Sequence, residues 1–279
     1  MLERALSGER SNERLAVRRR TRRRMGLIFF LILLLLLLTA TIYGLRQSAA
    51  RISHIEVISV DASLSGYATS RMQGNYFGII PRDSIFFFPE ESIRADILSS
   101  HNDIVAVSIL RNGFTGILIK ADYRVPVARW CGDATRFNLE DSDLRLNLVA
   151  DCYFFDTDGL IYSAATTTQP INSFVVYNAL PVDDDPIGST LPFAKDFPAI
   201  FDFARQLSTL GSQVVSVAIH DGEVDNRLAS GTRVTYVLGR EQVAFTALVS
   251  ARNNFNLADG SVDYVDLRFD GKVYVKPKK

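Results

Sequence analysis

Residues 25–45 form a run of 21 amino acids without a charged side chain, bounded by Arg24 and Arg46. A helix of this length is about 30 Å long, which matches the hydrocarbon core of a bilayer, and it satisfies its own backbone hydrogen bonds. A cleaved signal peptide is the main alternative because residues 48–50 are small, but its apolar core usually has only about 7 to 15 residues. We therefore predict an uncleaved transmembrane helix over residues 25–45.

The charges on either side of this run predict its orientation. Residues 1–24 contain nine arginines and three glutamates, whereas only Arg46 and Arg51 closely follow the run. By the positive-inside rule the N-terminus is cytoplasmic, and the remaining chain lies outside a cell membrane that it crosses once. We expect residues 1–24 to form a basic tail that binds anionic lipid, with the first 20 residues disordered. A docking tail for a cytoplasmic partner or nucleic acid is the alternative.

The outer portion is acidic. Of the 31 basic and 31 acidic residues in the chain, 22 and 28 remain after residue 24, a net charge of −6. This balance argues against nucleic acid as a partner.

The two cysteines, Cys131 and Cys152, both lie in strand-like runs on the outer side, where a disulfide persists. A disulfide, two buried thiols and one reactive thiol are the three interpretations. Two cysteines are too few for a structural zinc site, and the three histidines show no metal-ligand spacing. We predict neither a metal nor a cofactor.

The periodicity of the outer chain predicts an α+β fold with two domains. In the first, residues 46–125, a strand at 52–60 precedes a weak helix within 61–81 and a short amphipathic helix within 85–100, with Pro89 in its first turn. Two strands at 104–110 and 115–123 follow. Asn112-Gly113 is a strong hairpin signal between those strands. Such an order gives a small sheet covered by two helices.

The second domain, residues 126–279, is predicted to be a mostly antiparallel β domain with two helices. Its helices occupy 197–210, with Asp196 as the cap, and 241–254. Its predicted strands are 125–131, 146–156, 160–163, 174–177, 214–220, 233–238 and the final pair described below. We interpret Asp151, Asp156 and Asp158 as turn residues at a hairpin tip, because the loop pattern of a calcium site is missing.

The chain ends in two strands around Asp270-Gly271, a type I′ turn signal. A two-residue turn would place Tyr274 opposite Leu267 and Val273 beside Arg268, whereas a bulge would exchange the faces. The last strand ends the sheet, so a partner strand can complete its edge. The predicted partner-binding residues are Arg268, Val273, Tyr274 and Val275. Lys272 and Lys276 have a second interpretation, as charges that prevent aggregation of the edge.

Two motifs carry a resemblance to a known family. The order strand, helix, helix, strand, strand after a single span, ending with Arg124 and Pro126, resembles the POTRA domain of the FtsQ/DivIB family of bacterial cell-division proteins. Tyr123 stands where that family has Glu. The run of Tyr264, Asp266, Leu267, Arg268 and Phe269 before a terminal strand resembles the family's C-terminal end.

The resemblance covers residues 1–276 and implies a non-enzymatic scaffold at the division septum. Such a scaffold recruits FtsL- and FtsB-type single-span proteins and links early and late septal peptidoglycan machinery. A POTRA-bearing secretion or envelope-assembly protein is the alternative, although repeated POTRA units and a β-barrel are not visible. No catalytic motif occurs, and the remote enzymatic interpretation is a sortase-like transpeptidase with Cys152 as nucleophile and His101 or His220 as base.

Overall fold

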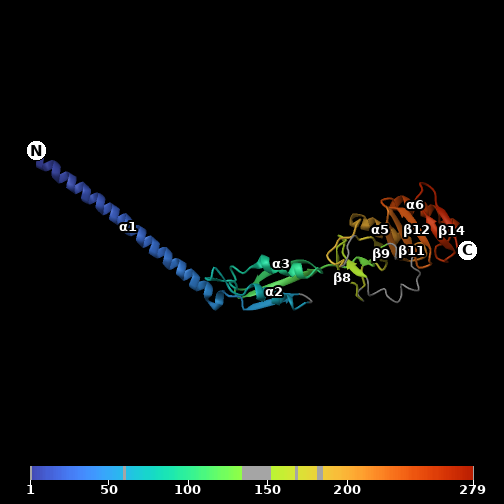
Figure 1. The fold of residues 1–279 in the computed structure, drawn as a ribbon, viewed down its shortest axis with the longest axis horizontal. Coiled ribbons are helices and arrows are strands. Elements are labelled where there is room, and N and C mark those ends of the chain that lie inside the picture. Colours follow the sequence, from blue (N-terminus) through green and yellow to red (C-terminus); the bar gives the residue numbers. More distant parts are fainter. Residues whose placement is uncertain (1, 59–60, 134–151, 167–168, 181–184, 279) are drawn as a thin grey trace. The chain divides into compact units, whose positions relative to one another are not determined.

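The structure, a computed structural model, describes residues 2–58, 61–133, 152–166, 169–180 and 185–278. Figure 1 shows the elements of this α+β chain. The chain divides into two compact units. The first comprises Met1–Ser100 and Ala106–Asp122, and the second comprises His101–Val105 and Tyr123–Lys279.

One long helix, α1 (Leu2–Arg46), contains the whole apolar run. Its segment Arg22–Arg46 is long and apolar enough to cross a membrane. The expectation that the first 20 residues are disordered is wrong at the level of the backbone, because the helix begins at Leu2. Arg, Leu, Ala and Glu have high helix propensity, and extending an existing helix needs no new nucleation.

The first unit contains a three-stranded sheet in the order β1-β5-β4. β1 (His54–Ile58) runs parallel to β5 (Gly116–Tyr123), and β4 (Ile104–Asn112) is the other neighbour of β5. Between β1 and β4 lie the helices α2 (Leu64–Arg71) and α3 (Glu90–Ser100), separated by a hairpin of β2 (Asn75–Tyr76) and β3 (Ile80–Pro81). The predicted order of strands and helices is therefore present, with the small hairpin added.

Apolar side chains from both helices and the sheet form the core of this unit. Leu64 of α2, Ile93 and Ile97 of α3, and Ile117 and Ile119 of β5 are fully buried. In β1 the side chains alternate between partly buried and exposed, as the period of a strand requires.

The second unit contains a nine-stranded, mostly antiparallel sheet in the order β14-β13-β12-β11-β10-β9-β6-β7-β8. Its strands are β6 (Ala128–Trp130), β7 (Tyr153–Phe155), β8 (Ile161–Ala164), β9 (Val175–Asn178), β10 (Val214–His220), β11 (Glu223–Leu228), β12 (Arg233–Val237), β13 (Val262–Asp266) and β14 (Tyr274–Pro277). β11 was not predicted. The predicted strand at 146–156 lies outside the described residues before residue 152.

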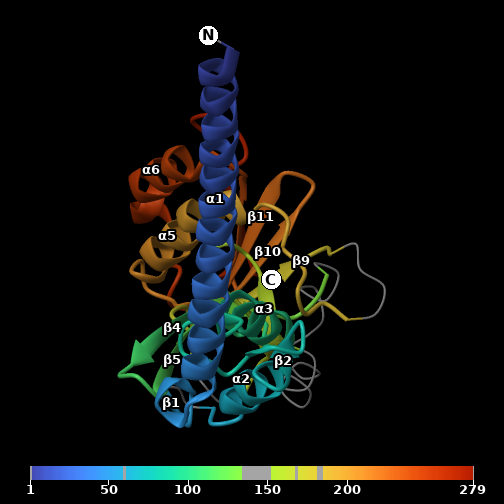
Figure 2. The same ribbon diagram turned by 90° about the vertical axis from the view of Figure 1, so that its left-hand side faces the viewer.

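Two helices, α5 (Phe197–Ser208) and α6 (Glu241–Ala251), lie on the same side of β10 and β11 (Figure 2). Each connects a parallel pair, α5 between β9 and β10 and α6 between β12 and β13. Parallel neighbours need a crossover connection, which explains why a mostly antiparallel sheet carries helices here. Phe203 of α5 packs between the helices and the sheet, with its ring centroid 4.2 Å from that of Tyr236.

Short 3₁₀ helices occupy η1 (Ser48–Ala50), η3 (Ala194–Asp196) and η4 (Arg252–Asn254). Asp196 occupies the predicted N-cap position of α5, but it also ends η3 and its side chain makes no capping hydrogen bond. η4 continues the predicted second helix to its expected end at residue 254.

Cys131 and Cys152 form a disulfide next to the paired strands β6 and β7. Both cysteines are buried in a small cluster with Phe154, Tyr162 and Tyr177. In this oxidised form Cys152 has no thiol to act as a nucleophile, so the residue on which the sortase-like interpretation depends serves as a cross-link.

Candidate partner-binding edge

β14 forms one edge of the large sheet. It pairs antiparallel with β13, and in the part of the chain that the structure describes no strand lies on its other side. Tyr274 lies opposite Asp266, and Val275 lies opposite Val265. The register expected from a two-residue turn, with Tyr274 opposite Leu267, is therefore wrong by one residue, and Val273 precedes the strand.

The turn around Asp270-Gly271 explains this register. The backbone N–H of Lys272 donates to the carbonyl of Phe269 at 3.2 Å, so a turn is present. A type I′ turn needs a positive φ at both central residues, but only Gly271 has one, at 65°. Residues 267–273 therefore form a wider loop.

Two apolar residues at the ends of this loop keep the chain segments apart. Leu267 is buried and donates its backbone N–H to the carbonyl of Thr235 on β12, at 2.8 Å. Val273 packs against the same core from the other end of the loop. Both side chains therefore pack against the core, and the two residues do not form a strand pair.

The backbone of β14 presents an outward row of polar groups. The N–H of Lys278 donates to the carbonyl of Ser261 at 2.8 Å, so Lys278 faces the side of β13. Because successive residues of a strand face opposite sides, Tyr274 and Lys276 also direct their backbone groups to β13. Val275 and Pro277 direct theirs to the free edge, and Pro277 contributes only a carbonyl.

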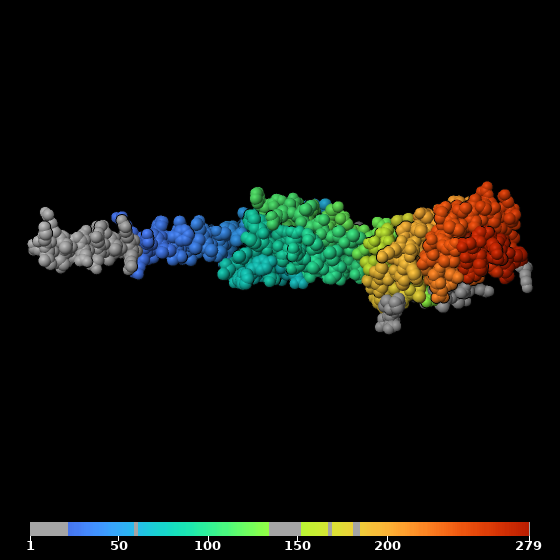
Figure 3. Space-filling model, turned by 90° about the horizontal axis from the view of Figure 1, so that it is seen from above, coloured from blue at the N-terminus to red at the C-terminus, as the bar shows by residue number. Residues whose placement is uncertain are grey.

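Apolar side chains are exposed on both faces of this edge. The rings of Phe269 and Tyr274 meet edge to face with centroids 5.2 Å apart, and both are about half exposed. Val275 is also exposed, on the face it shares with Val265. In the space-filling view, red surface marks the C-terminal end of the chain (Figure 3). The edge therefore combines unpaired backbone groups with exposed apolar side chains.

Basic residues lie beside these apolar side chains. Arg233 and Lys276 approach the ring of Tyr264, with distances of 5.9 Å and 5.5 Å to its centroid. The Nζ of Lys276 lies 2.8 Å from Asp263, whose hydrogen bond raises the pKa of Lys276. The same contact lowers the pKa of Asp263. Arg233 and Lys276 therefore flank the ring of Tyr264 beside the edge, and the charge of Lys276 is paired with that of Asp263.

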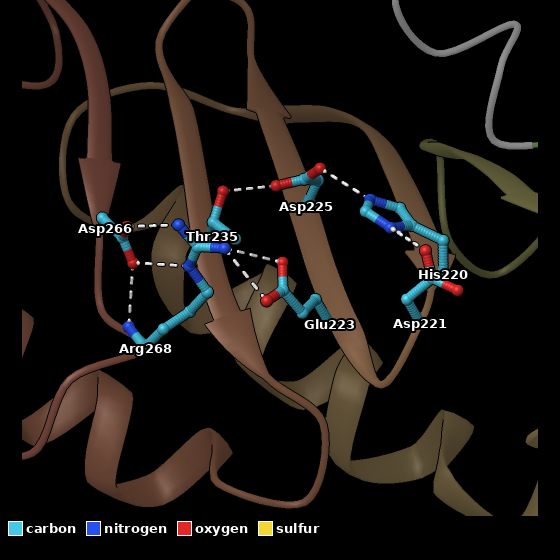
Figure 4. Close-up of polar contacts among 7 residues, drawn as sticks. All are labelled: His220, Asp221, Glu223, Asp225, Thr235, Asp266 and Arg268. Carbon is cyan, nitrogen blue, oxygen red and sulfur yellow. Dashed lines mark hydrogen bonds and ion pairs between the residues drawn. The ribbon is translucent and has the colours of Figure 1, made fainter.

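Two carboxylates, those of Asp266 and Glu223, hold the side chain of Arg268 (Figure 4). Its guanidinium donates to Asp266 at 2.7 and 3.0 Å and to both carboxylate oxygens of Glu223 at 2.9 and 3.0 Å. These hydrogen bonds raise the pKa of Arg268 and lower the pKa of Asp266. Arg268 thus positions the loop that leads to β14.

The polar network continues across β11 to β10. Asp225 accepts a hydrogen bond from the hydroxyl of Thr235, and its other oxygen lies 3.0 Å from Nε2 of His220. The sequence contains a signal for this network, because Glu223, Asp225 and Arg227 recur at every second position, with Val224 and Leu228 on the opposite face. That alternation was missed together with β11.

Arg124 and Pro126, the other residues of the family motif, contact the beginning of the second unit. Arg124 forms an ion pair with Asp156 and donates to the carbonyl of Asn102 at 2.8 Å. The carbonyl of Pro126 accepts from the N–H of Ile171 at 3.0 Å. Both residues therefore contact structural groups of this unit.

Asp156 also confirms the predicted turn chemistry at the hairpin tip. Its Oδ1 accepts from the backbone N–H groups of Asp158 and Leu160, each at 3.0 Å. Asp151 lies outside the described residues. Across the described ranges, no three His, Cys, Asp or Glu side chains are grouped as metal ligands.

No protein-family model matches the chain, and no curated protein is significantly similar to it.

Proposed function

We propose that this chain is a non-enzymatic scaffold of the bacterial division septum, similar to FtsQ/DivIB proteins. Its second unit captures an extended segment of an FtsL- or FtsB-type single-span protein by strand addition at β14. The observation that carries this proposal is the free edge of β14, with the outward backbone groups of Val275 beside the exposed ring of Tyr274. Through this partner the scaffold joins the septal peptidoglycan synthesis complex.

The rest of the chain fits such a scaffold. α1, with arginines before its apolar segment, suits a single span with a cytoplasmic N-terminus. The order β1, α2, α3, β4, β5 is the one expected of a POTRA domain.

The surroundings of the edge define the chemistry of the partner strand. Backbone hydrogen bonds supply affinity for any extended segment, and side-chain contacts select among segments. Phe269 and Tyr274 suit an apolar side chain on one face. Arg233, beside the ring of Tyr264, suits an acidic side chain on that face, where charge pairing also speeds association.

Proline substitution tests strand addition at single backbone positions. Val275→Pro removes an outward N–H and leaves the bonds to β13 in place, whereas Val275→Ala keeps the N–H and serves as the matched control. We expect Val275→Pro to weaken binding of the partner's extracytoplasmic segment roughly tenfold, because the net free energy of about one hydrogen bond is lost. The measurement is a titration of the detergent-solubilised full-length chain.

Tyr274→Pro is the second comparison, because it removes a bond to β13 and should loosen β14 itself. Binding by Val275→Pro that equals that of Val275→Ala, with the same thermal unfolding, would contradict strand addition.

Localisation tests the septal part of the proposal. A fluorescent tag on the N-terminus should form a band at mid-cell that is lost when residues 126–279 are deleted. Uniform label around the envelope of dividing cells would contradict a septal role and favour the secretion alternative.

A further inference from the structure

Three loops of the first unit carry phenylalanines that are exposed to solvent. The exposed fraction is 97% for Phe77, 79% for Phe114, 54% for Phe86 and 52% for Phe87. Single exposed apolar residues are ordinary, but four large aromatic rings on one small unit mark an interaction surface.

Hydrogen bonds tie one of these loops to the end of α1 and a second to η1, which follows it. The guanidinium of Arg46, the last residue of α1, donates to the carbonyl of Ile79 at 3.2 and 3.3 Å, two residues from Phe77. The N–H of Ile85 donates to the carbonyl of Ala50 at 3.0 Å, next to Phe86. Both loops therefore lie where the chain leaves the apolar helix.

The third loop is tied to the same segment. The N–H groups of Ser53 and His54 donate to the carbonyl of Thr115 at 2.9 and 3.1 Å. Thr115 directly follows Phe114 in the turn between β4 and β5. All three loops thus meet residues 46–54.

The backbone at Phe77 supports a functional reason for this exposure. Phe77 and Gly78 have φ values of 51° and 72°, and the N–H of Ile79 donates to the carbonyl of Tyr76 at 3.0 Å. Asn, Asp or Gly normally occupies the first position of such a turn, and a bulky residue there is strained. The strained turn projects an aromatic ring into solvent although a small polar residue would relieve it.

The position of these loops identifies their partner. An apolar helix that crosses a bilayer leaves it close to its terminal charged residue, here Arg46, at the level of the lipid headgroups. Aromatic rings concentrate at that level in membrane proteins. Arg82, whose guanidinium lies 5.1 Å from the ring centroid of Tyr76, adds a cation beside the same hairpin that suits anionic lipid.

We propose that Phe77, Phe86, Phe87 and Phe114 form a phenylalanine collar that inserts into the outer leaflet of the membrane. The collar binds the first unit to the lipid surface around the end of α1. It depends on α1 spanning the membrane and is independent of strand capture at β14.

Tryptophan substitution locates the collar relative to the lipid. The full-length chain is reconstituted in vesicles of phosphatidylethanolamine and phosphatidylglycerol, with and without bromine on the acyl chains. Phe77→Trp and Phe86→Trp report on the collar. Ile58→Trp is the matched control, because Ile58 has the same exposed fraction as Phe86, 54%. Ile58 lies at the far end of β1 from His54, the residue that is hydrogen-bonded to the third loop. The natural Trp130 is buried, and the unsubstituted chain supplies its background.

Interfacial side chains reach roughly 5 to 10 Å into the boundary between headgroups and acyl chains. We therefore expect brominated lipid to remove about half of the added emission at positions 77 and 86 and to leave position 58 unchanged. Aqueous iodide should quench the emission at position 58 more strongly than the emission at positions 77 and 86. Circular dichroism melting shows that each variant is folded.

Equal responses at the three positions would overturn the proposal. So would protection of position 77 from iodide only when a protein partner is added, since the surface would then bind protein and not lipid.

Discussion

The carboxylate of Asp266 accepts three hydrogen bonds from Arg268, two from the guanidinium and one from the backbone N–H. Leu267 lies between these residues in the sequence and turns its side chain into the core. The contact therefore closes the bend at the end of β13 and sets the direction in which the chain approaches β14.

Replacing Arg268 with Lys should loosen this bend. A lysine ammonium cannot bind two carboxylates in the fork geometry of a guanidinium, so Asp266 and Glu223 would lose part of their pairing. We expect a loss of about 1 to 2 kcal/mol in the free energy of unfolding, moderated because solvent screens this partly exposed side chain. Urea denaturation measures the loss, and faster hydrogen exchange at the Tyr274 amide would place it at the edge.

The same contact predicts a dependence on acid. Hydrogen bonds from Arg268 hold the pKa of Asp266 below its ordinary value of 3.8. A carboxylate with a lowered folded-state pKa contributes stability that is present above the ordinary value and lost as the pH falls through the lowered value. The unfolding free energy of Arg268→Lys should therefore fall less steeply than that of the parent below pH 3.8. Parallel acid profiles would contradict this assignment.

Removing the disulfide should destabilise the second unit. Cys131 and Cys152 are 21 residues apart, and closing a loop of that size typically contributes about 3 kcal/mol through the unfolded state. Replacing both cysteines with Ala should lower the urea midpoint by a corresponding amount. Reductant should have the same effect on the parent and none on the double variant, which separates the cross-link from the packing of the side chains.

Tyr236 is expected to tolerate the loss of its hydroxyl. Among the residues that the structure describes, no group accepts from or donates to this buried hydroxyl. An unpaired buried polar group costs stability, so Tyr236→Phe should leave stability unchanged or raise it by up to about 1 kcal/mol. A loss of more than that in thermal unfolding would reveal a partner.

Burial of Tyr236 also predicts a dependence on alkali. Burial raises the pKa of its hydroxyl above the ordinary value of 10. The unfolded chain loses this proton above pH 10 and the folded chain keeps it, so stability falls as the pH rises. The unfolding free energy of Tyr236→Phe should fall less steeply than that of the parent as the pH rises through this range.

Arg124→Met should destabilise the second unit more than the edge variants do. Both partners of the pair between Arg124 and Asp156 are largely buried, and the substitution leaves a buried carboxylate without its cation. Losing one partner of such a pair typically costs about 3 to 5 kcal/mol. The double variant Arg124→Met, Asp156→Asn should recover part of this loss in the same unfolding measurement, because no uncompensated charge remains.

The elements with strong local signals could be predicted from the sequence. α1 follows from its uninterrupted apolar run, and α5 follows from apolar residues at helical spacing after Pro198. The crossovers could not be foreseen, because parallel pairing of β9 with β10 is a long-range property that strand periodicity does not encode.

Two Asp-Gly pairs show where local signals are insufficient. Asp221 and Gly222, which were overlooked, have positive φ values of 49° and 77° and join β10 directly to β11. Asp270-Gly271 was predicted to do the same and forms a wider loop. Around the first pair, strand pairing continues to His220 opposite Glu223, whereas around the second the core draws Leu267 and Val273 out of register. The competing contacts are tertiary, so the dipeptide alone does not decide between the two outcomes.

Pro277 gives the free edge of β14 a length limit. An added strand that pairs with Val275 reaches, at the next outward position, a residue without an N–H, and the regular ladder stops there. A short ladder forms fewer hydrogen bonds than a long one and dissociates more readily. The same proline also makes the strand a poor template for a second copy of itself, so the molecule can keep a reactive edge without growing into fibres.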